Sequence, residues 1–164
     1  MPTQNKIHIT KLFLAAILAI VSWHNSVAVA ALGGDAASVE TDRQQMRAGA
    51  AIQTTPSAGV AGGYTVHETT LPSGTLVRQY VSSAGAVFAV GWNGPYPPNL
   101  EQLLGTYFPQ FVAIQAGQNG AGTRSVTTHT PDFVIEAGGH QRDFAGRAYL
   151  PAMLPNGVNT QDIR

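Results

Sequence analysis

The stretch from residue 64 to residue 92 constrains the fold more than any other part of the sequence. It contains runs rich in Val, Thr, Tyr, Phe and Trp, which suit the pleated, half-buried surface of a β-sheet. These runs cover residues 64–70, 75–81 and 87–92. The segments between them, LPSG and SSAG, resemble hairpin loops in which glycine takes the left-handed position after a type I turn. The sequence therefore predicts an antiparallel three-stranded meander.

The loops also predict the register of the meander. The first loop pairs Leu71 with Thr75, which places Glu68 directly opposite Arg78. Such an opposite-charge pair across two strands contributes roughly 0.2–1 kcal/mol. Because side chains alternate along a strand, the same register collects the aromatic residues on one face. That predicted face consists of Tyr64, Val66, Glu68, Leu76, Arg78, Tyr80, Phe88, Val90 and Trp92.

An amphipathic helix is predicted over residues 99–116. Asn99 is a favourable N-cap residue, and apolar side chains recur after it at helical spacing. Pro109 lacks a backbone N–H, so a kink or break is expected near Phe108. The apolar stripe is typical of core, and we expect it to cover the aromatic face of the meander; the alternative is a surface for a membrane or a partner. The stripe consists of Leu100, Leu103, Leu104, Tyr107, Phe108, Phe111 and Val112.

The remaining elements are predicted from caps and turns. Asp35 can cap a helix that runs to about Ala48. Gly138 and Gly139 separate two strand-like runs, residues 133–137 and 140–150, which indicates a type I′ hairpin. A last helical turn is expected from about residue 159 to residue 164.

The order of these elements indicates the fold class. Strand runs separated by one helix, without βαβ alternation, favour an α+β fold with an antiparallel sheet. We expect the sheet to comprise the three-strand meander plus the C-terminal hairpin. An N-terminal helix and the central amphipathic helix would pack on one face. Segments near 48–63 and 116–131 are rich in small and polar residues and are predicted to be flexible linkers, although a binding role for the second remains open.

The first thirty residues are typical of an export signal. Lys6 and Lys11 precede an apolar run over residues 12–21, and Ala28-Val29-Ala30 matches an A-x-A cleavage site. The apolar run is too short for the ~20 residues that span a bilayer. We therefore predict a signal peptide over residues 1–30, cleaved after Ala30 with Ala28 as the alternative, and a single α+β domain over residues 31–164. The expected location is periplasmic or secreted, with no stable membrane anchor after cleavage.

Composition excludes several classes of protein. The chain contains no cysteine, which excludes disulfides, thiolate nucleophiles, cysteine-ligated metals and the usual bacterial lipid anchor. Over residues 31–164 seven arginines face nine acidic residues, a net charge of −2. This balance lacks the basic surface of a nucleic-acid-binding protein, so no nucleic-acid partner is expected.

No motif in the sequence indicates catalysis. There is no G-x-S-x-G elbow and no H-E-x-x-H zinc motif. His67 and Glu68 are adjacent, so a strand would place them on opposite faces, and His140 and Asp143 also differ in parity. The sequence therefore assigns no catalytic, cofactor-binding or metal-ligating residue and predicts no cofactor.

Aromatic and arginine side chains are the remaining candidates for binding. Trp92 at a strand end, Tyr96 among prolines and Arg147 near Tyr149 have the chemistry of interface anchors. Ordinary packing is the more frequent role of such residues.

Several segments together resemble a known family. These are ALGGDAASVETDRQQM, the meander YTVHETTLPSGTLVRQYVSSAGAVFAVGW, LEQLLGTYF and the closing GRAYLPAMLPNGVNTQDIR. The chain resembles DUF2844, a family of exported proteins of Gram-negative bacteria without an assigned activity, over essentially all of residues 31–164. The resemblance implies a compartment and a single-domain unit, but no site residues.

Two functional hypotheses follow. The first is a non-enzymatic binding or accessory protein of the envelope, with another envelope protein or component as its partner. The alternative is a small cofactor-free periplasmic enzyme such as a hydrolase. A cleft in which histidine and carboxylate groups converge would favour the second hypothesis. An exposed apolar patch or an open sheet edge would favour the first.

Overall fold

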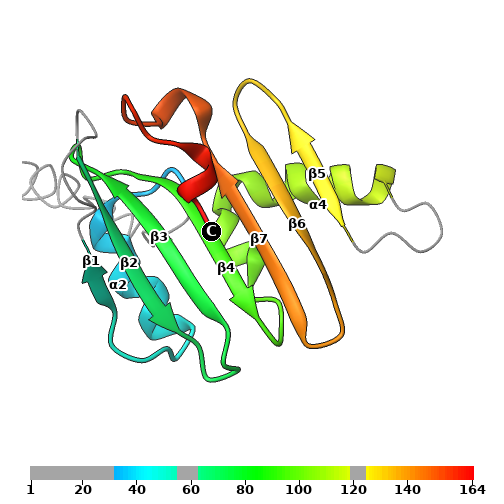
Figure 1. Cartoon of the computed structure of the whole chain (residues 1–164), viewed down its shortest axis with the longest axis horizontal. Helices are drawn as coiled ribbons and strands as arrows, with labels where there is room; N and C mark the ends of the chain where they lie inside the picture. Colours follow the sequence, from blue (N-terminus) through cyan, green and yellow to red (C-terminus); the bar gives the residue numbers. More distant parts are fainter. Residues whose placement is uncertain (1–31, 55–62, 119–124) are drawn as a thin grey trace, which may run out of the picture.

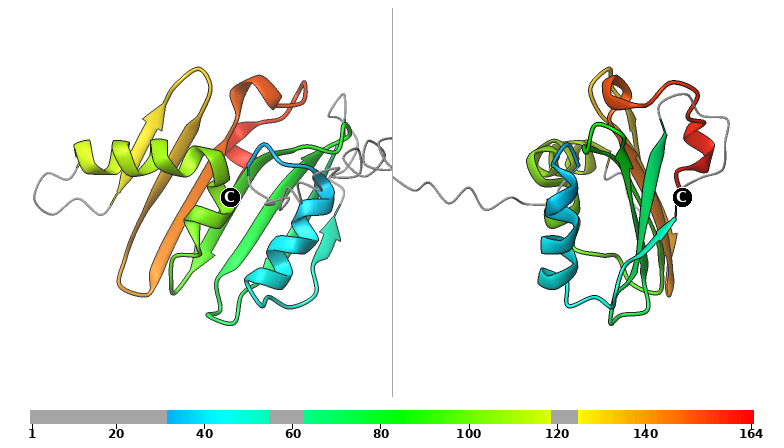
Figure 2. Two further views of the ribbon diagram at one scale, coloured as in Figure 1. Left: turned by 180° about the vertical axis from the view of Figure 1, so that it is seen from behind. Right: turned by 90° about the vertical axis from the view of Figure 1, so that its left-hand side faces the viewer.

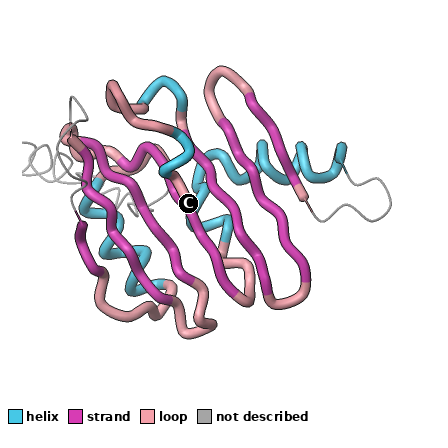
Figure 3. Tube along the Cα trace, in the orientation of Figure 1, coloured by secondary structure: helices cyan, strands magenta, loops and turns pink. Residues whose placement is uncertain are grey.

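The computed structural model describes residues 32–54, 63–118 and 125–164, so the predicted signal peptide lies outside the described residues. The described chain forms one seven-stranded antiparallel sheet in the order β1-β2-β3-β4-β7-β6-β5 (Figures 1 and 3). The strands are β1 Ile52–Thr54, β2 Tyr64–Thr70, β3 Leu76–Ser82, β4 Val87–Gly94, β5 Val126–His129, β6 Val134–His140 and β7 Asp143–Tyr149. The predicted α+β class with one antiparallel sheet is confirmed, and the meander and the hairpin join through β4 and β7. The sheet differs from the prediction in its two additional edge strands, β1 and β5.

Two helical segments cover one face of this sheet (Figure 2). The first, α2 (Ala36–Gln45), is capped by Asp35 as predicted, although it ends before Ala48. The second is divided into α3 (Leu100–Leu104), the 3-10 turn η1 (Gly105–Tyr107) and α4 (Phe108–Gln118). The break expected near Phe108 is therefore present. It begins at Gly105, which has φ 51°, while Pro109 lies in the first turn of α4, where no N–H is needed.

The predicted register of the first hairpin is confirmed. Glu68 is paired with Arg78, and their Oε2 and Nε atoms lie 2.8 Å apart. The Leu71 N–H donates to the Thr75 carbonyl at 2.8 Å, as a three-residue loop requires. Both side chains of the charged pair remain partly exposed, so the pair lies at the rim of the core.

The predicted faces of the third strand are wrong for Val90 and Trp92, because β4 contains a β-bulge. Val81 is paired with Val87 but Tyr80 is paired with Ala89, which leaves Phe88 as an additional residue. The extra residue reverses the alternation of side chains beyond it. As a result Phe88 stays with the tyrosines, whereas Val90 and Trp92 point to the opposite face, contrary to the prediction.

The helices cover the opposite face from the one predicted. Leu103, Leu104 and Phe111 are buried, but they belong to a cluster that includes Val90 and excludes Phe88. Val112 was expected in the core but is 44% exposed. The buried cluster on this helical face consists of Leu32, Val39, Ala48, Leu71, Val77, Val81, Val87, Val90, Trp92, Leu103, Leu104, Phe111, Val126, Phe133, Ile135, Ala148 and Leu150.

The aromatic face is covered instead by the C-terminal residues 151–164, which we call the C-terminal strap (Figure 2). The strap contains the 3-10 turns η2 (Pro151–Met153) and η3 (Thr160–Asp162), the second of which confirms the predicted last helical turn. Its Ile163 is 1% exposed and fills the cluster on this face. The buried members of that cluster are Tyr64, Tyr80, Phe88, Ala89, Val134, Tyr149 and Ile163.

A row of five residues across the sheet holds the end of the strap. The pairings between strands align Glu68, Arg78, Gly91, Arg147 and Glu136. Each glutamate orients its arginine, whose Nη1 donates to a main-chain carbonyl of the strap. Arg78 reaches the Arg164 carbonyl at 2.8 Å, and Arg147 reaches the Thr160 carbonyl at 2.6 Å.

Gly91, at the centre of this row, makes room for the strap backbone. A Cβ atom at this position would lie 2.8 Å from the carbonyl carbon of Arg164. The hydroxyl of Tyr80, on the neighbouring strand, accepts from the Arg164 N–H at 3.1 Å. The sheet therefore holds the strap by hydrogen bonds to its main chain and by the buried side chain of Ile163.

The C-terminal hairpin turns later than predicted. Gly138 and Gly139 lie within β6, and the turn is formed by Gln141 and Arg142. In the predicted hairpin Glu136 would face Gln141, whereas in the structure it faces Arg147 and forms an ion pair at 2.8 Å. The register of strand pairing therefore overrides the local turn preference of the two glycines.

Both segments predicted as flexible linkers contain an edge strand. β1 pairs with β2, and β5 pairs with β6; the rest of these two segments lies partly outside the described residues. At the β5 edge the Gln118 side chain donates to the Thr127 carbonyl at 2.7 Å and accepts from the Thr127 N–H at 3.2 Å. The Gln118 amide thus occupies the N–H and carbonyl of Thr127, with which another strand could otherwise pair.

Replacing Leu104 should test the helical core. Leu104 is fully buried, so Leu104→Ala removes packing and leaves a cavity that typically costs about 2–5 kcal/mol. Urea unfolding followed by circular dichroism would measure the loss. Val112→Ala, on the exposed side of α4, is the control and should leave the free energy of unfolding within about 0.5 kcal/mol. Equal effects of the two substitutions would show that the stripe is a surface.

A second prediction concerns the space beneath the strap. Gly91→Ala places a methyl group against the Arg164 backbone, and overpacking of this kind costs about 1–3 kcal/mol. Hydrogen exchange of the amides at 162–164 should accelerate as the strap loosens. Gly117→Ala in α4, where a Cβ meets no atom within 4 Å, should be neutral or slightly stabilising. Unchanged exchange in the Gly91 variant would contradict the close approach.

Candidate functional site

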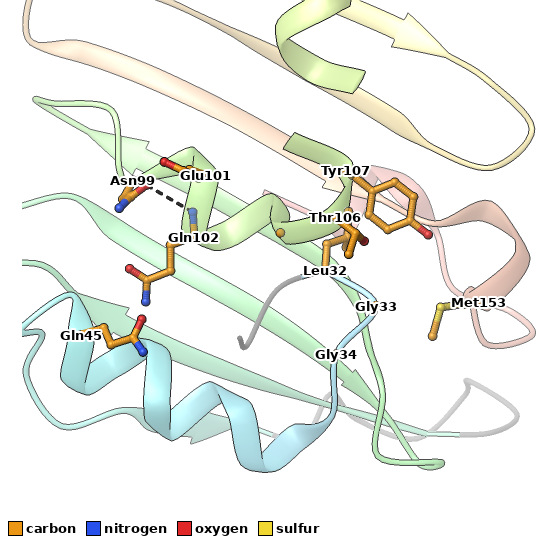
Figure 4. Close-up of a pocket in the computed structure, with 11 residues that line it drawn as sticks. Leu32, Gly33, Gly34, Gln45, Asn99, Glu101, Gln102, Thr106, Tyr107 and Met153 are labelled. Carbon is orange, nitrogen blue, oxygen red and sulfur yellow. Dashed lines mark hydrogen bonds between the residues drawn. The ribbon is translucent and has the colours of Figure 1, made fainter. Parts of the chain in front are cut away.

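A groove of about 790 Å³ lies on the helical face. We call it the inter-helix groove, because it lies between α2 with the residues before it and α3 with η1 (Figure 4). Gln45 and Gln102 point toward one another from its two sides, and Tyr107 and Met153 lie toward the other end. Its lining consists of Leu32, Gly33, Gly34, Gln45, Asn99, Glu101, Gln102, Gly105, Thr106, Tyr107 and Met153.

A buried carboxylate holds the two sides of the groove together. Asp42 on α2 is fully buried, and its two oxygens accept from the Nε2 atoms of Gln79 and Gln102, each at 2.9 Å. Gln79 lies on β3 and Gln102 on α3, so Asp42 connects α2 to the sheet and to the second helical segment. A buried carboxylate needs such donors, and removing one would weaken the hydrogen bonding that stabilises its charge. This arrangement supports a groove of fixed width.

The N-terminus of α3 supplies the polar end of the groove. The Asn99 side chain caps the helix by accepting from the Gln102 N–H at 3.2 Å, as drawn in Figure 4. Glu101 follows in the first turn and is exposed. Thr106 is exposed after the break at Gly105, and the Tyr107 ring stacks on Phe133 with centroids 5.2 Å apart. The break in the helix is thus what turns Thr106 and Tyr107 toward the groove.

The loop that precedes α2 forms the floor of the groove. The Leu32 N–H donates to the Leu103 carbonyl at 3.0 Å, and the Gly33 N–H donates to the Val87 carbonyl at 2.8 Å. The Gly34 carbonyl in turn accepts from the Val87 N–H at 2.9 Å. These three bonds hold the loop against the sheet and against α3.

His67 lies in a second, smaller depression of about 390 Å³, between α2 and the β1–β2 edge. Burial lowers the pKa of His67 from its usual value, so the imidazole is neutral at pH 7. The same depression contains Glu40, whose pKa is lowered to about 2 by hydrogen bonds from Arg43 first and Gln44 second. No residue that lines this depression within the described chain carries a hydroxyl nucleophile.

The histidines in the described part of the chain are dispersed. Among the described residues no group of three or more histidine, aspartate or glutamate side chains could hold an ion. His67 lines the depression beside α2 while Glu68 pairs with Arg78 beneath the strap, so the two lie on opposite faces as predicted. The parity argument for His140 and Asp143 was wrong, because the two face one another across the turn with Nδ1 and Oδ2 3.8 Å apart.

The aromatic and arginine anchors suggested by the sequence are dispersed. Trp92 is 2% exposed and packs over Gly146, where a Cβ would lie 2.3 Å from the indole ring. Arg147 is engaged with Glu136 and the strap. Tyr96 is 53% exposed and borders a depression of about 620 Å³ together with Arg142. None of these residues lines the inter-helix groove.

Sequence reasoning missed the residues that line the groove. They come from residues 32–34, from α2, from residues 99–107 and from Met153 at the start of the strap. The available signals were the caps at Asp35 and Asn99, which predict where two helices begin but not that they approach each other. Gln45, Glu101 and Gln102 appear in the sequence as ordinary helix-surface residues.

Comparison with known proteins identifies the family. No curated protein and no solved structure matches the chain significantly. In the part of the chain that the structure describes, no helix combines the length and the apolar character that crossing a membrane requires. The profile of a family described as "Protein of unknown function (DUF2844)" matches residues 28–163, nearly the whole chain. The resemblance seen in the meander and in the closing segment is thereby confirmed, and the chain belongs to the DUF2844 family.

Proposed function

We propose that this protein is a non-enzymatic binding or accessory module of the bacterial envelope, located in the periplasm or secreted, and that the inter-helix groove is its binding site. The observation that carries the proposal is the lining of the groove. It combines amides, one carboxylate and hydroxyls with apolar surface from Leu32, Tyr107 and Met153. Ligand sites commonly have this composition, a mostly apolar concavity with a few placed polar groups.

The separation of chemical groups favours binding over catalysis. The groove has the hydroxyls of Thr106 and Tyr107 and the carboxylate of Glu101, but no imidazole. The imidazole of His67 lies in the other depression, which lacks a hydroxyl. A hydrolase of the Ser–His type needs nucleophile and base within hydrogen-bond reach, and the described residues do not bring such a pair together in either depression.

Site-specific cross-linking tests the groove as the binding site. A photo-reactive amino acid at Gln45, which faces the groove, should capture an envelope component in intact cells. The same amino acid at Gln115, exposed on α4 and outside the groove, is the matched control and should capture nothing specific. Mass spectrometry of the products would identify the component. Equal capture from both positions, or none from either, would contradict the proposal.

The envelope location rests on the tripartite N-terminal pattern, and it has its own test. Protein isolated from the periplasmic fraction should have an intact mass that corresponds to a chain beginning at Ala31. A cytoplasmic control protein should be absent from the same fraction. Recovery of the chain with Met1 still attached to membranes would show that the pattern is not a cleaved signal.

A further inference from the structure

Two hydrogen bonds determine which polar atoms the groove presents to a ligand. A backbone N–H can only donate, so the Gln102 N–H must meet the oxygen of the Asn99 amide. The Asn99 NH2 group is left as a donor, and it has no hydrogen-bond partner among the described residues. Because Asn99 is exposed at the mouth of the groove, this donor is available to a ligand.

The same reasoning applies to Gln102, with the opposite result. Asp42 offers carboxylate and carbonyl oxygens at 2.9 and 3.3 Å, and both can only accept, so they must meet the Gln102 NH2 group. The Gln102 Oε1 atom is thereby left as an acceptor, without a partner in the described chain. The groove thus presents a fixed donor at Asn99 and a fixed acceptor at Gln102, three residues later on the same helix.

The charge of the groove restricts the ligand further. Glu101 is the one charged residue among those that line it, so the lining carries a negative charge and no compensating cation. Phosphate, sulfate and carboxylate ligands would be repelled by Glu101. A suitable ligand must therefore donate to Gln102 and Glu101, accept from Asn99, and carry no acidic group.

We propose that the inter-helix groove binds a saccharide that lacks acidic groups. Each sugar hydroxyl both donates and accepts, so neighbouring hydroxyls can satisfy Asn99 and Gln102 together. The carbon-bound hydrogens of a sugar ring form an apolar face that suits the Tyr107 ring and Met153 at the other end of the groove. A peptide suits the lining less well, because the Gly33 N–H and the Gly34 carbonyl already bond to Val87 and so cannot pair with an added strand.

A titration followed by NMR tests this inference, which rests on the proposed function of the groove. The probes are chitotetraose, which is neutral, and tetragalacturonic acid, which is an anionic oligosaccharide of the same length. Chitotetraose should shift the side-chain amide signals of Asn99, Gln102 and Gln45 in the intact protein. Tetragalacturonic acid should bind at least tenfold more weakly, because its carboxylates would be repelled by the negative charge of Glu101.

Asn99→Asp isolates the predicted donor. Aspartate is as good an N-cap as asparagine, so the helix and its cap remain, but the NH2 donor is replaced by an acceptor. Affinity for chitotetraose should fall about tenfold or more, which corresponds to about 1.4 kcal/mol. Asn159→Asp is the matched control, because Asn159 also caps a helical turn through its oxygen but lies on the strap. The Asn159→Asp variant should bind chitotetraose with the same affinity as the protein without a substitution.

Three results would overturn the inference: no shifts at the groove amides, equal binding of the anionic oligosaccharide, or unchanged affinity of the Asn99→Asp variant. The cross-linking experiment separates these failures from failure of the proposed function. Capture of a peptide or protein from Gln45 without any saccharide response would refute the saccharide class and leave the groove as a binding site. Absence of both responses would refute the two proposals together.

Discussion

The single extra residue in β4 determines how this domain buries its apolar surface. By inserting Phe88 into the ladder, the bulge lets one central strand supply an aromatic ring to the strap face and then Val90 and Trp92 to the helical face. Without it, alternation would place all three large side chains on one face. The strand that contacts both β3 and β7 therefore anchors two separate clusters, and the strap and the helices each depend on that division.

The sequence predicts the parts of this fold that local rules control. Loop composition and alternation were sufficient for the register of Glu68 and Arg78, and the caps at Asp35 and Asn99 begin their helices where expected. The errors arise where the pairing of strands departs from what the loop residues alone prefer. The bulge at Phe88 has no glycine or proline to mark it, and the pairing of Glu136 with Arg147 moves the last turn away from Gly138.

The candidate site was beyond local rules for a similar reason. Asn99 and Gln102 are recognisable as a helix start, but their value to a ligand depends on Asp42, some 60 residues earlier in the chain. Only the fold shows that this carboxylate engages the Gln102 NH2 group and leaves the amide oxygen without a partner in the described chain. A pattern of free donors and acceptors is a property of packing, because hydrogen bonds inside the protein determine which atoms remain.

The strap also affects when the domain can finish folding during its synthesis. Tyr80 and Arg78 bond to residues 82 to 86 positions further along the chain. Ile163 fills a cluster that includes Tyr64, Tyr80 and Phe88, which are synthesised much earlier. Contacts between residues so far apart in sequence form late and slow folding. During synthesis the tyrosine-rich face of the meander stays uncovered until the last residues of the described chain have been made. Until then it presents the kind of exposed apolar surface that chaperones retain in an unfolded state.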